Sequence, residues 1–176
     1  MTTNIFEKLP EIFTDDKPEC ESIQLIGRLN NERVIKFVPK KYIKGPGNLD
    51  KYKVILPKAN GSGAIGEVLS TPLVGTPLVG HTQTFISIGE LETFDEADSL
   101  FKYIKSKFAR TLLGVLKITQ DNKKGTWKYV PLQDFTVNSD IDWTQSVADI
   151  DRQLYQKYDL SPEEIAFIET HVREMD

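Results

Sequence analysis

The residues best suited to chemistry in this chain of 176 residues are a group of carboxylates near a lysine. Glu90, Glu92, Asp95 and Glu96 lie close together, and Lys102 follows them. A metal-dependent nuclease needs such a group, because metal ions held by carboxylates neutralise the scissile phosphate. The same spacing is typical of the first turn of a helix, where negative charge interacts favourably with the helix dipole. We favour the helical interpretation and keep a restriction nuclease as the alternative.

Other catalytic motifs are missing from the sequence. His81 and His171 lie far apart, and neither has a cysteine or histidine at zinc-ligand spacing. The sequence contains no G-x-S-x-G, P-loop or H-E-x-x-H motif. We therefore expect no catalytic residue, metal site or cofactor, and no enzymatic activity in this chain alone. His81 is expected to have a structural role or to hydrogen-bond a ligand.

The basic residues are concentrated in the middle of the chain. Residues 28–128 carry seventeen basic and nine acidic side chains, a net charge of +8. The flanking segments are acidic, with net charges of -4 for residues 1–27 and -8 for residues 129–176. A positive centre of this kind favours a surface that binds a polyanion. The alternative is a solvated surface on which the charged residues are distributed by chance and bind no common ligand.

Two basic stretches predict where a nucleic acid would bind. Residues 33–58 and 102–128 each contain eight basic side chains and one acidic side chain, with aromatic residues such as Tyr42 and Trp127 between them. Lysines contact phosphates and add affinity without sequence information, whereas amide and forked side chains in loops read base edges. The predicted DNA-binding residues are Lys40, Lys41, Lys44, Lys58, Asn60, Ser62, His81, Gln83, Lys102, Lys105 and Arg110.

Residue patterns predict several strands that would position these side chains. Residues 22–28 and 33–38 are rich in β-formers, and Asn30-Asn31 between them predicts a hairpin, because asparagine tolerates positive φ. Residues 52–56 and 82–88 are the other predicted strands, and residues 127–130 are predicted to form a short strand or an extended entry to a corner. A glycine-containing loop follows residue 57, and TPLVG then occurs twice in succession at residues 71–80, which we interpret as consecutive turns.

Helical spacing predicts a long helix over residues 95–117. Its apolar residues form one continuous stripe, and Lys102, Lys105, Lys107 and Arg110 fall off that stripe. We expect this helix to pack on a sheet and to present a basic side to water or a partner. Two further helices are predicted over residues 147–158 and from Ser161, where S-P-E-E is a capping box.

These elements predict a mixed α/β fold, in which a twisted sheet packs on the long helix and carries a helical C-terminal cap. We divide the chain into an N-terminal segment or linker (1–21), an α/β recognition core (22–130) and a helical cap (131–176). The composition is that of a soluble globular protein, and no apolar run is long enough to cross a membrane. With Cys20 as the single cysteine, no internal disulfide can form, so we expect a cytoplasmic location.

Several segments of the amino-acid sequence resemble a known family. They are YKVILPKANGSGAIGEVLSTPLVG, HTQTFISIG, SLFKYIKSKFARTLLGVLKITQ, WKYVPLQDFTVNSDIDW and IDRQLYQKYDLSPEEIAFIE. Together they resemble the C-terminal target-recognition (specificity) region of TaqI-like adenine-specific DNA methyltransferases and of related fused type II restriction-modification enzymes. The resemblance covers residues 4–172, and its last two stretches are its most specific part.

The resemblance implies a module that binds double-stranded DNA and supplies specificity to a neighbouring catalytic domain. The family's Asn/Asp-Pro-Pro-Tyr/Phe motif and its glycine motif for S-adenosylmethionine are not recognisable in this sequence. Base flipping and catalysis would therefore belong to a methyltransferase or endonuclease domain, in cis or in trans. A further alternative is a protein-interaction domain whose acidic tail binds a catalytic subunit.

Overall fold

The hairpin predicted around Asn30 and Asn31 is present in the computed structural model, which describes residues 1–61 and 64–175. Strands β1 (Ser22–Leu29) and β2 (Glu32–Pro39) are antiparallel. The φ angles of Asn30 and Asn31 are 51° and 65°, as a two-residue primed turn requires. A short strand, β5 (Val79–His81), pairs parallel with β1 and completes a sheet of order β2-β1-β5.

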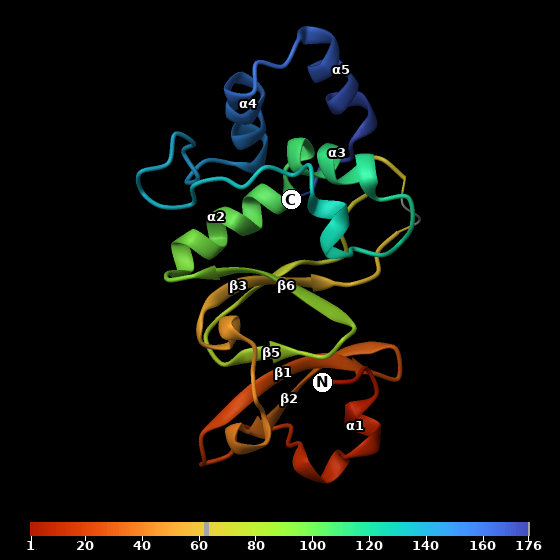
Figure 1. The fold of residues 1–176 in the computed structure, drawn as a ribbon, viewed down its shortest axis with the longest axis vertical. Helices are drawn as coiled ribbons and strands as arrows, with labels where there is room; N and C mark the ends of the chain where they lie inside the picture. The colour runs from red at the N-terminus through yellow and green to blue at the C-terminus, as the bar shows by residue number, and fades with distance from the viewer. Residues whose placement is uncertain (62–63, 176) are drawn as a thin grey trace.

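A second sheet lies above the first (Figure 1). Its strands are β3 (Tyr52–Pro57), β4 (Leu73–Gly75) and β6 (Phe85–Leu91), in the antiparallel order β4-β3-β6. The prediction of one twisted sheet therefore differs from the structure, which has two. The reason lies in the duplicated TPLVG segment, because its first copy contributes β4 to the upper sheet and its second copy contributes β5 to the lower sheet.

The N-terminal segment packs on the lower sheet. It contains the helix α1 (Ile5–Lys8) and the 3₁₀ turn η1 (Pro10–Ile12). Phe6 and Phe13 are buried, and their rings meet edge to face with centroids 4.9 Å apart. They form a small apolar cluster with side chains of β1, β2 and Leu49. Residues 1–21 are thus anchored to the sheet through these two phenylalanines.

The predicted strand over residues 127–130 is wrong. The chain forms the 3₁₀ turn η4 (Lys124–Trp127) there, because local hydrogen bonds bend it back on itself. Thr126 N donates to Lys123 O at 2.9 Å, and Val130 N donates to Trp127 O at 3.1 Å. Two similar turns, η2 (Lys40–Tyr42) and η3 (Gly47–Asp50), lie between β2 and β3.

Helices cover the upper sheet on the side away from the hairpin, as Figure 1 shows. The predicted long helix is divided at Ser106 into α2 (Phe94–Lys105) and α3 (Lys107–Leu116). Ser106 has ψ of 146°, which is not helical, and its hydroxyl caps α3 by accepting from Ala109 N. Asp151 accepts the backbone N–H groups of Lys107 and Phe108, each at 2.9 Å. A side chain distant in sequence thus stabilises the break.

The C-terminal cap consists of α4 (Val147–Lys157) and α5 (Pro162–His171), as predicted. The capping box predicted at Ser161 is confirmed, with Glu164 as its second member. The largest apolar cluster joins α2, α3, α4 and α5 to the upper sheet. The mixed α/β class is therefore confirmed. Among the described residues, no helix combines the length and apolar character needed to cross a membrane.

Candidate nucleic-acid interface

A cleft of about 680 Å³ lies between the two sheets and gathers four of the predicted DNA-binding residues. We term it the inter-sheet cleft. Lys44 comes from the loop after η2, Lys58 follows β3, His81 ends β5, and Gln83 precedes β6. These positions are far apart in the sequence, and the pairing of β5 with β1 brings them together.

Hydrogen bonds hold the turn that carries His81 and Gln83. Lys58 N donates to Thr84 O at 2.9 Å, and Gln83 N donates to Met1 O at 2.9 Å. Thr82 is fully buried, and its N–H donates to Ile26 O at 2.9 Å. The side chain of Gln83 is exposed above this fixed backbone. Its amide is therefore presented to solvent from a rigid support.

The imidazole of His81 is half-buried and neutral near pH 7. Burial lowers its pKa below the ordinary value of 6.5, and the positive charges of the Met1 amine and Lys53 lower it further. His81 Nδ1 lies 2.9 Å from Thr82 O, which opposes part of this shift. A neutral imidazole offers a hydrogen bond and no charge, so the cations of the cleft must come from lysines.

Lys53 lies beneath the inter-sheet cleft and was not among the predicted site residues. Its ammonium donates to four carbonyl oxygens, those of Asn48, Leu49, Lys51 and Thr76, at 2.8–3.3 Å. The side chain is 1% exposed, and burial lowers its pKa to about 8. Lys53 thus ties η3 and the β4–β5 connection together. A lysine within YKVIL gives no sequence signal for this role, because strand lysines ordinarily face water.

Nine of the 22 lysines and arginines form ion pairs with carboxylates in the described residues, and several lysines around the cleft do not. Within residues 1–61 and 64–175, no ion pair involves any of five exposed lysines. We term this set the unpaired lysines: Lys41, Lys44, Lys58, Lys124 and Lys128. Lys58 and Lys124 are brought near each other because Asn122 N donates to Lys58 O at 2.7 Å. The sequence analysis counted Lys124 and Lys128 in a basic stretch without assigning them to the site.

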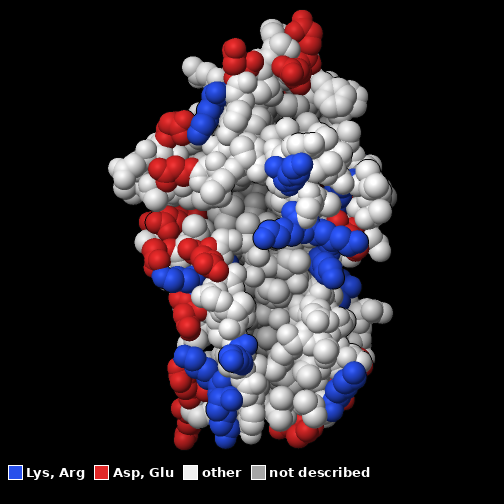
Figure 2. All heavy atoms as spheres, in the orientation of Figure 1, with Lys and Arg blue, Asp and Glu red and all other residues white. Residues whose placement is uncertain are grey.

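The charge distribution is uneven on the face that Figure 2 shows. Lysine and arginine side chains gather over η4 and over η2, with uncharged surface between them. Carboxylates line the opposite edge near the start of α2 and cover the top of α5. Basic and acidic residues are mixed elsewhere, as the ion pairs of Lys40 with Glu21 and of Lys51 with Glu92 show.

A second hollow of about 490 Å³ adjoins the cleft, sharing Ile86 and Ser87 as lining residues. We term it the aromatic pocket. It lies between the edge strand β6, the helix α2 and the segment 122–135, and its aromatic walls are Tyr103, Trp127 and Phe135. The sequence analysis noted Trp127 only as an aromatic residue within a basic stretch.

The prediction that the 95–117 helix presents a basic side to water or a partner is wrong, because α4 and α5 cover that side. Arg110 is 2% exposed, and its guanidinium donates to the backbone oxygens of Lys105, Glu67 and Arg173. Burial lowers the pKa of Arg110 from its ordinary value. Lys105 is 8% exposed, with its ammonium 5.0 Å from the centre of the Phe101 ring. Neither cation is free to bind a phosphate.

Two further predicted phosphate contacts have internal partners. Lys102 donates to Trp143 O at 2.8 Å and lies 3.4 Å from Asp98. Lys40 forms an ion pair with Glu21 at 2.8 Å. The neighbouring Lys41 remains exposed, with its ammonium 5.1 Å from the centre of the Tyr42 ring.

The prediction that Asn60 contacts DNA bases is wrong, because its side chain is buried and forms hydrogen bonds within the protein. Asn60 is 5% exposed; its amide donates to Val68 O at 2.9 Å and accepts from Ser70 N at 2.5 Å. It closes the loop between β3 and β4. Ser62, the other predicted reading residue of this loop, lies outside the described residues.

The carboxylates considered for a nuclease have local roles. Glu96 forms the capping box of α2 with Thr93, and Glu92 pairs with Lys51 at 2.5 Å. In the part of the chain that the structure describes, no group of three or more histidine, cysteine or carboxylate side chains is placed to hold a metal ion. The helical interpretation is confirmed for Asp95 and Glu96, which lie in the first turn of α2, whereas Glu90 lies in β6 and Glu92 precedes the helix. Comparison of the chain with protein-family models, curated proteins and solved structures finds no match.

Proposed function

We propose that this chain is a DNA target-recognition domain of a bacterial restriction-modification system, acting in the cytoplasm. It binds duplex DNA and supplies sequence specificity to a methyltransferase or endonuclease domain that carries the catalytic residues. The proposal rests on the resemblance of residues 4–172 to such specificity regions and on the arrangement of charge around the inter-sheet cleft.

The observation that carries the proposal is the set of unpaired lysines. Elsewhere in the described residues, several lysines form ion pairs with carboxylates, such as Lys36 with Asp15 and Lys157 with Asp140, whereas the exposed Lys8 and Lys17 form none. Three of the five unpaired lysines line two adjoining hollows: Lys44 and Lys58 line the inter-sheet cleft, and Lys124 lines the aromatic pocket. Cations left without partners at a concave surface attract a polyanion and release its counterions on binding.

Sequence reading would come from the turn between β5 and β6. The Gln83 amide is exposed on a hydrogen-bonded backbone, and amides of this kind make paired hydrogen bonds to adenine in the major groove. His81 contributes a neutral hydrogen-bonding group at the same end of the cleft. Phosphate contacts by Lys44 and Lys58 would set the register in which Gln83 meets the bases.

The first experiment measures affinity for labelled duplex DNA by fluorescence anisotropy at several salt concentrations. Lys58→Glu and Lys44→Glu should weaken binding to all sequences and reduce the slope of log K against log salt by about 0.9 each. Lys17→Glu is the matched control, since it makes the same charge change at an exposed lysine outside the lining of the cleft. It should leave the slope unchanged.

A chain that serves only as a protein-interaction domain would show no salt-dependent retention of DNA. That result with the wild-type chain would refute the proposal. Gln83→Ala tests the reading role separately, because it should leave the salt slope intact while reducing discrimination among duplex sequences. Equal discrimination by the wild type and the variant would remove Gln83 from the interface.

A further inference from the structure

Two residues that line the aromatic pocket carry buried polar atoms that the fold leaves without partners. Asn122 is fully buried, and its Nδ2 donates to Pro57 O at 3.1 Å, which fixes the orientation of the amide. Its Oδ1 has no hydrogen-bond partner, and neither does the buried Nε1 of Trp127. Buried polar groups are ordinarily paired, so an unpaired acceptor and an unpaired donor at one pocket are unusual.

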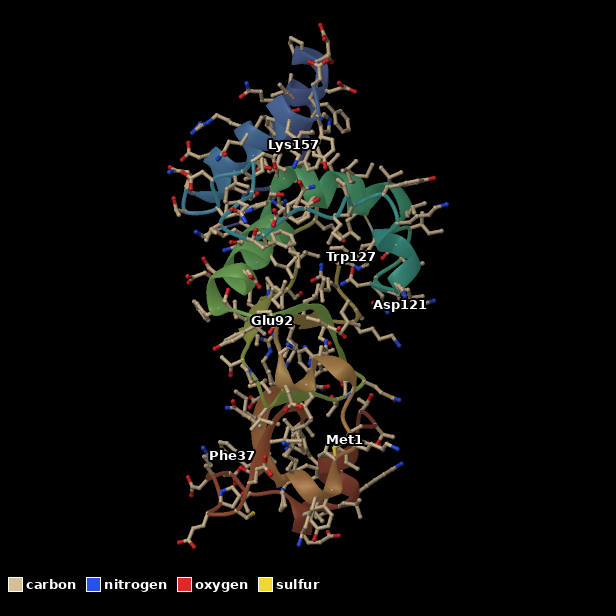
Figure 3. The ribbon with its side chains drawn as sticks, turned by 60° about the vertical axis from the view of Figure 1, so that its left-hand side comes forward. Met1, Phe37, Glu92, Asp121, Trp127 and Lys157 are labelled. Carbon is tan, nitrogen blue, oxygen red and sulfur yellow. The ribbon has the colours of Figure 1, made fainter. Side chains whose placement is uncertain are left out.

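The other indole of the chain shows the ordinary arrangement. Trp143 Nε1 donates to Asp134 O at 2.9 Å and to Ser139 Oγ at 3.0 Å. Tyr103 on the pocket wall is also satisfied, because its hydroxyl donates to Pro131 O at 2.6 Å. Among the described residues, three buried side-chain atoms lack a partner; one is Ser22 Oγ on β1, and the other two belong to Asn122 and Trp127, which line this pocket. In Figure 3, Trp127 lies on the inner side of η4, toward the body of the molecule.

The rim of the aromatic pocket is basic. Lys124 lines it, Lys128 ends the same turn, and Lys58 is joined to Asn122 through the backbone hydrogen bond described above. All three are among the unpaired lysines. Leu132, which also lines the pocket, is 91% exposed. The pocket therefore combines aromatic walls, an apolar entrance and one lining lysine, Lys124.

We infer that the aromatic pocket binds an unpaired nucleobase of the DNA held in the inter-sheet cleft. The occupant must have a flat face for the aromatic walls, a polar edge for Asn122 Oδ1 and Trp127 Nε1, and a negative charge near Lys124. A nucleotide meets these three requirements, and an apolar protein side chain meets only the first. The volume of about 490 Å³ lies within the range of about 300–1,000 Å³ that small-molecule sites occupy.

This inference rests on the proposed function, since the base must belong to bound DNA. The test uses three labelled duplexes of one sequence with the full chain. The first is fully paired, the second carries one bulged adenine, and the third carries an abasic residue at the bulge. The wild-type chain should bind the adenine bulge about tenfold more tightly than the abasic bulge, because stacking of one base on an aromatic ring changes affinity by about that factor.

Trp127→Leu should abolish this preference and leave the affinity for the paired duplex unchanged. Phe167→Leu is the matched control, since it removes a partly exposed aromatic ring of α5 outside the pocket, and it should retain the preference. Equal affinity of the wild-type chain for all three duplexes would overturn the base pocket and leave the proposed function standing. Persistence of the preference in Trp127→Leu would also overturn it, and failure to bind any duplex would overturn both proposals.

Discussion

Asp151 offers a quantitative test of how the break between α2 and α3 is stabilised. The side chain is 3% exposed and accepts two backbone N–H groups at the start of α3. Burial nevertheless raises its pKa from 3.8 to about 6. The difference of about 2.2 pKa units corresponds to about 3 kcal/mol, at about 1.36 kcal/mol per unit. The perturbation is Asp151→Asn, which resembles the protonated acid and does not titrate.

The sign follows from proton binding. Between pH 4 and pH 6 the folded chain holds a proton on Asp151 that the unfolded chain has released. Stability from this group is therefore present below pH 4 and declines as the pH rises to 6. The lowered pKa values of Asp134, Asp142 and Asp149 act in the opposite direction, but they are common to both proteins and cancel in the comparison.

The assay is urea denaturation of the wild type and Asp151→Asn at pH 4 and pH 7. The free energy of unfolding of the wild type minus that of the variant should fall by about 2 kcal/mol between these two pH values, because more than half of Asp151 is already ionised in the unfolded chain at pH 4. A difference that stays constant, or that grows with pH, would refute the reasoning. It would mean that the two backbone N–H groups outweigh burial in setting the pKa of Asp151.

Three further substitutions test single features of the fold by urea denaturation. Lys53→Met should lower the free energy of unfolding by about 2–4 kcal/mol, because four carbonyls lose their shared donor. Gly89→Ala should cost about 1–3 kcal/mol, since φ is +94° and the added Cβ would lie 2.9 Å from Leu100 Cδ2. Asn60→Ala should cost about 2–3 kcal/mol through its lost hydrogen bonds. DNA affinity of the folded Asn60→Ala variant should equal that of the wild type, and a relaxed sequence preference would contradict the structural role.

Only part of the candidate interface could be predicted from the sequence. Lys41, Lys44, Lys58 and Gln83 are predicted to bind DNA and are exposed in the structure, because they follow strand and turn signals in polar loops. Their contact with DNA stays a prediction. The burial of Lys105 could not be predicted in this way. A residue outside the apolar stripe of a helix faces water only if no other element packs on that side of the helix. The two helices that cover it come from the end of the chain, and no local pattern reports such a contact.

Local chemistry by itself determined the turns and helix starts of this protein. Asn30 and Asn31 can adopt positive φ at little cost, and the Ser161 box satisfies backbone donors within four residues. These features need no partner from elsewhere in the chain, so they can be predicted directly.

Only the tertiary structure decided where identical segments go. The two TPLVG copies have the same intrinsic preferences, yet the first pairs with β3 and the second with β1. Leu78 has φ of 63°, while its equivalent Leu73 lies in a strand. Likewise, Asp151 and Ser106 divide a helix whose apolar stripe is continuous. In each case the hydrogen-bond partner that decides the local conformation is distant in sequence. That partner comes close only when the chain has folded.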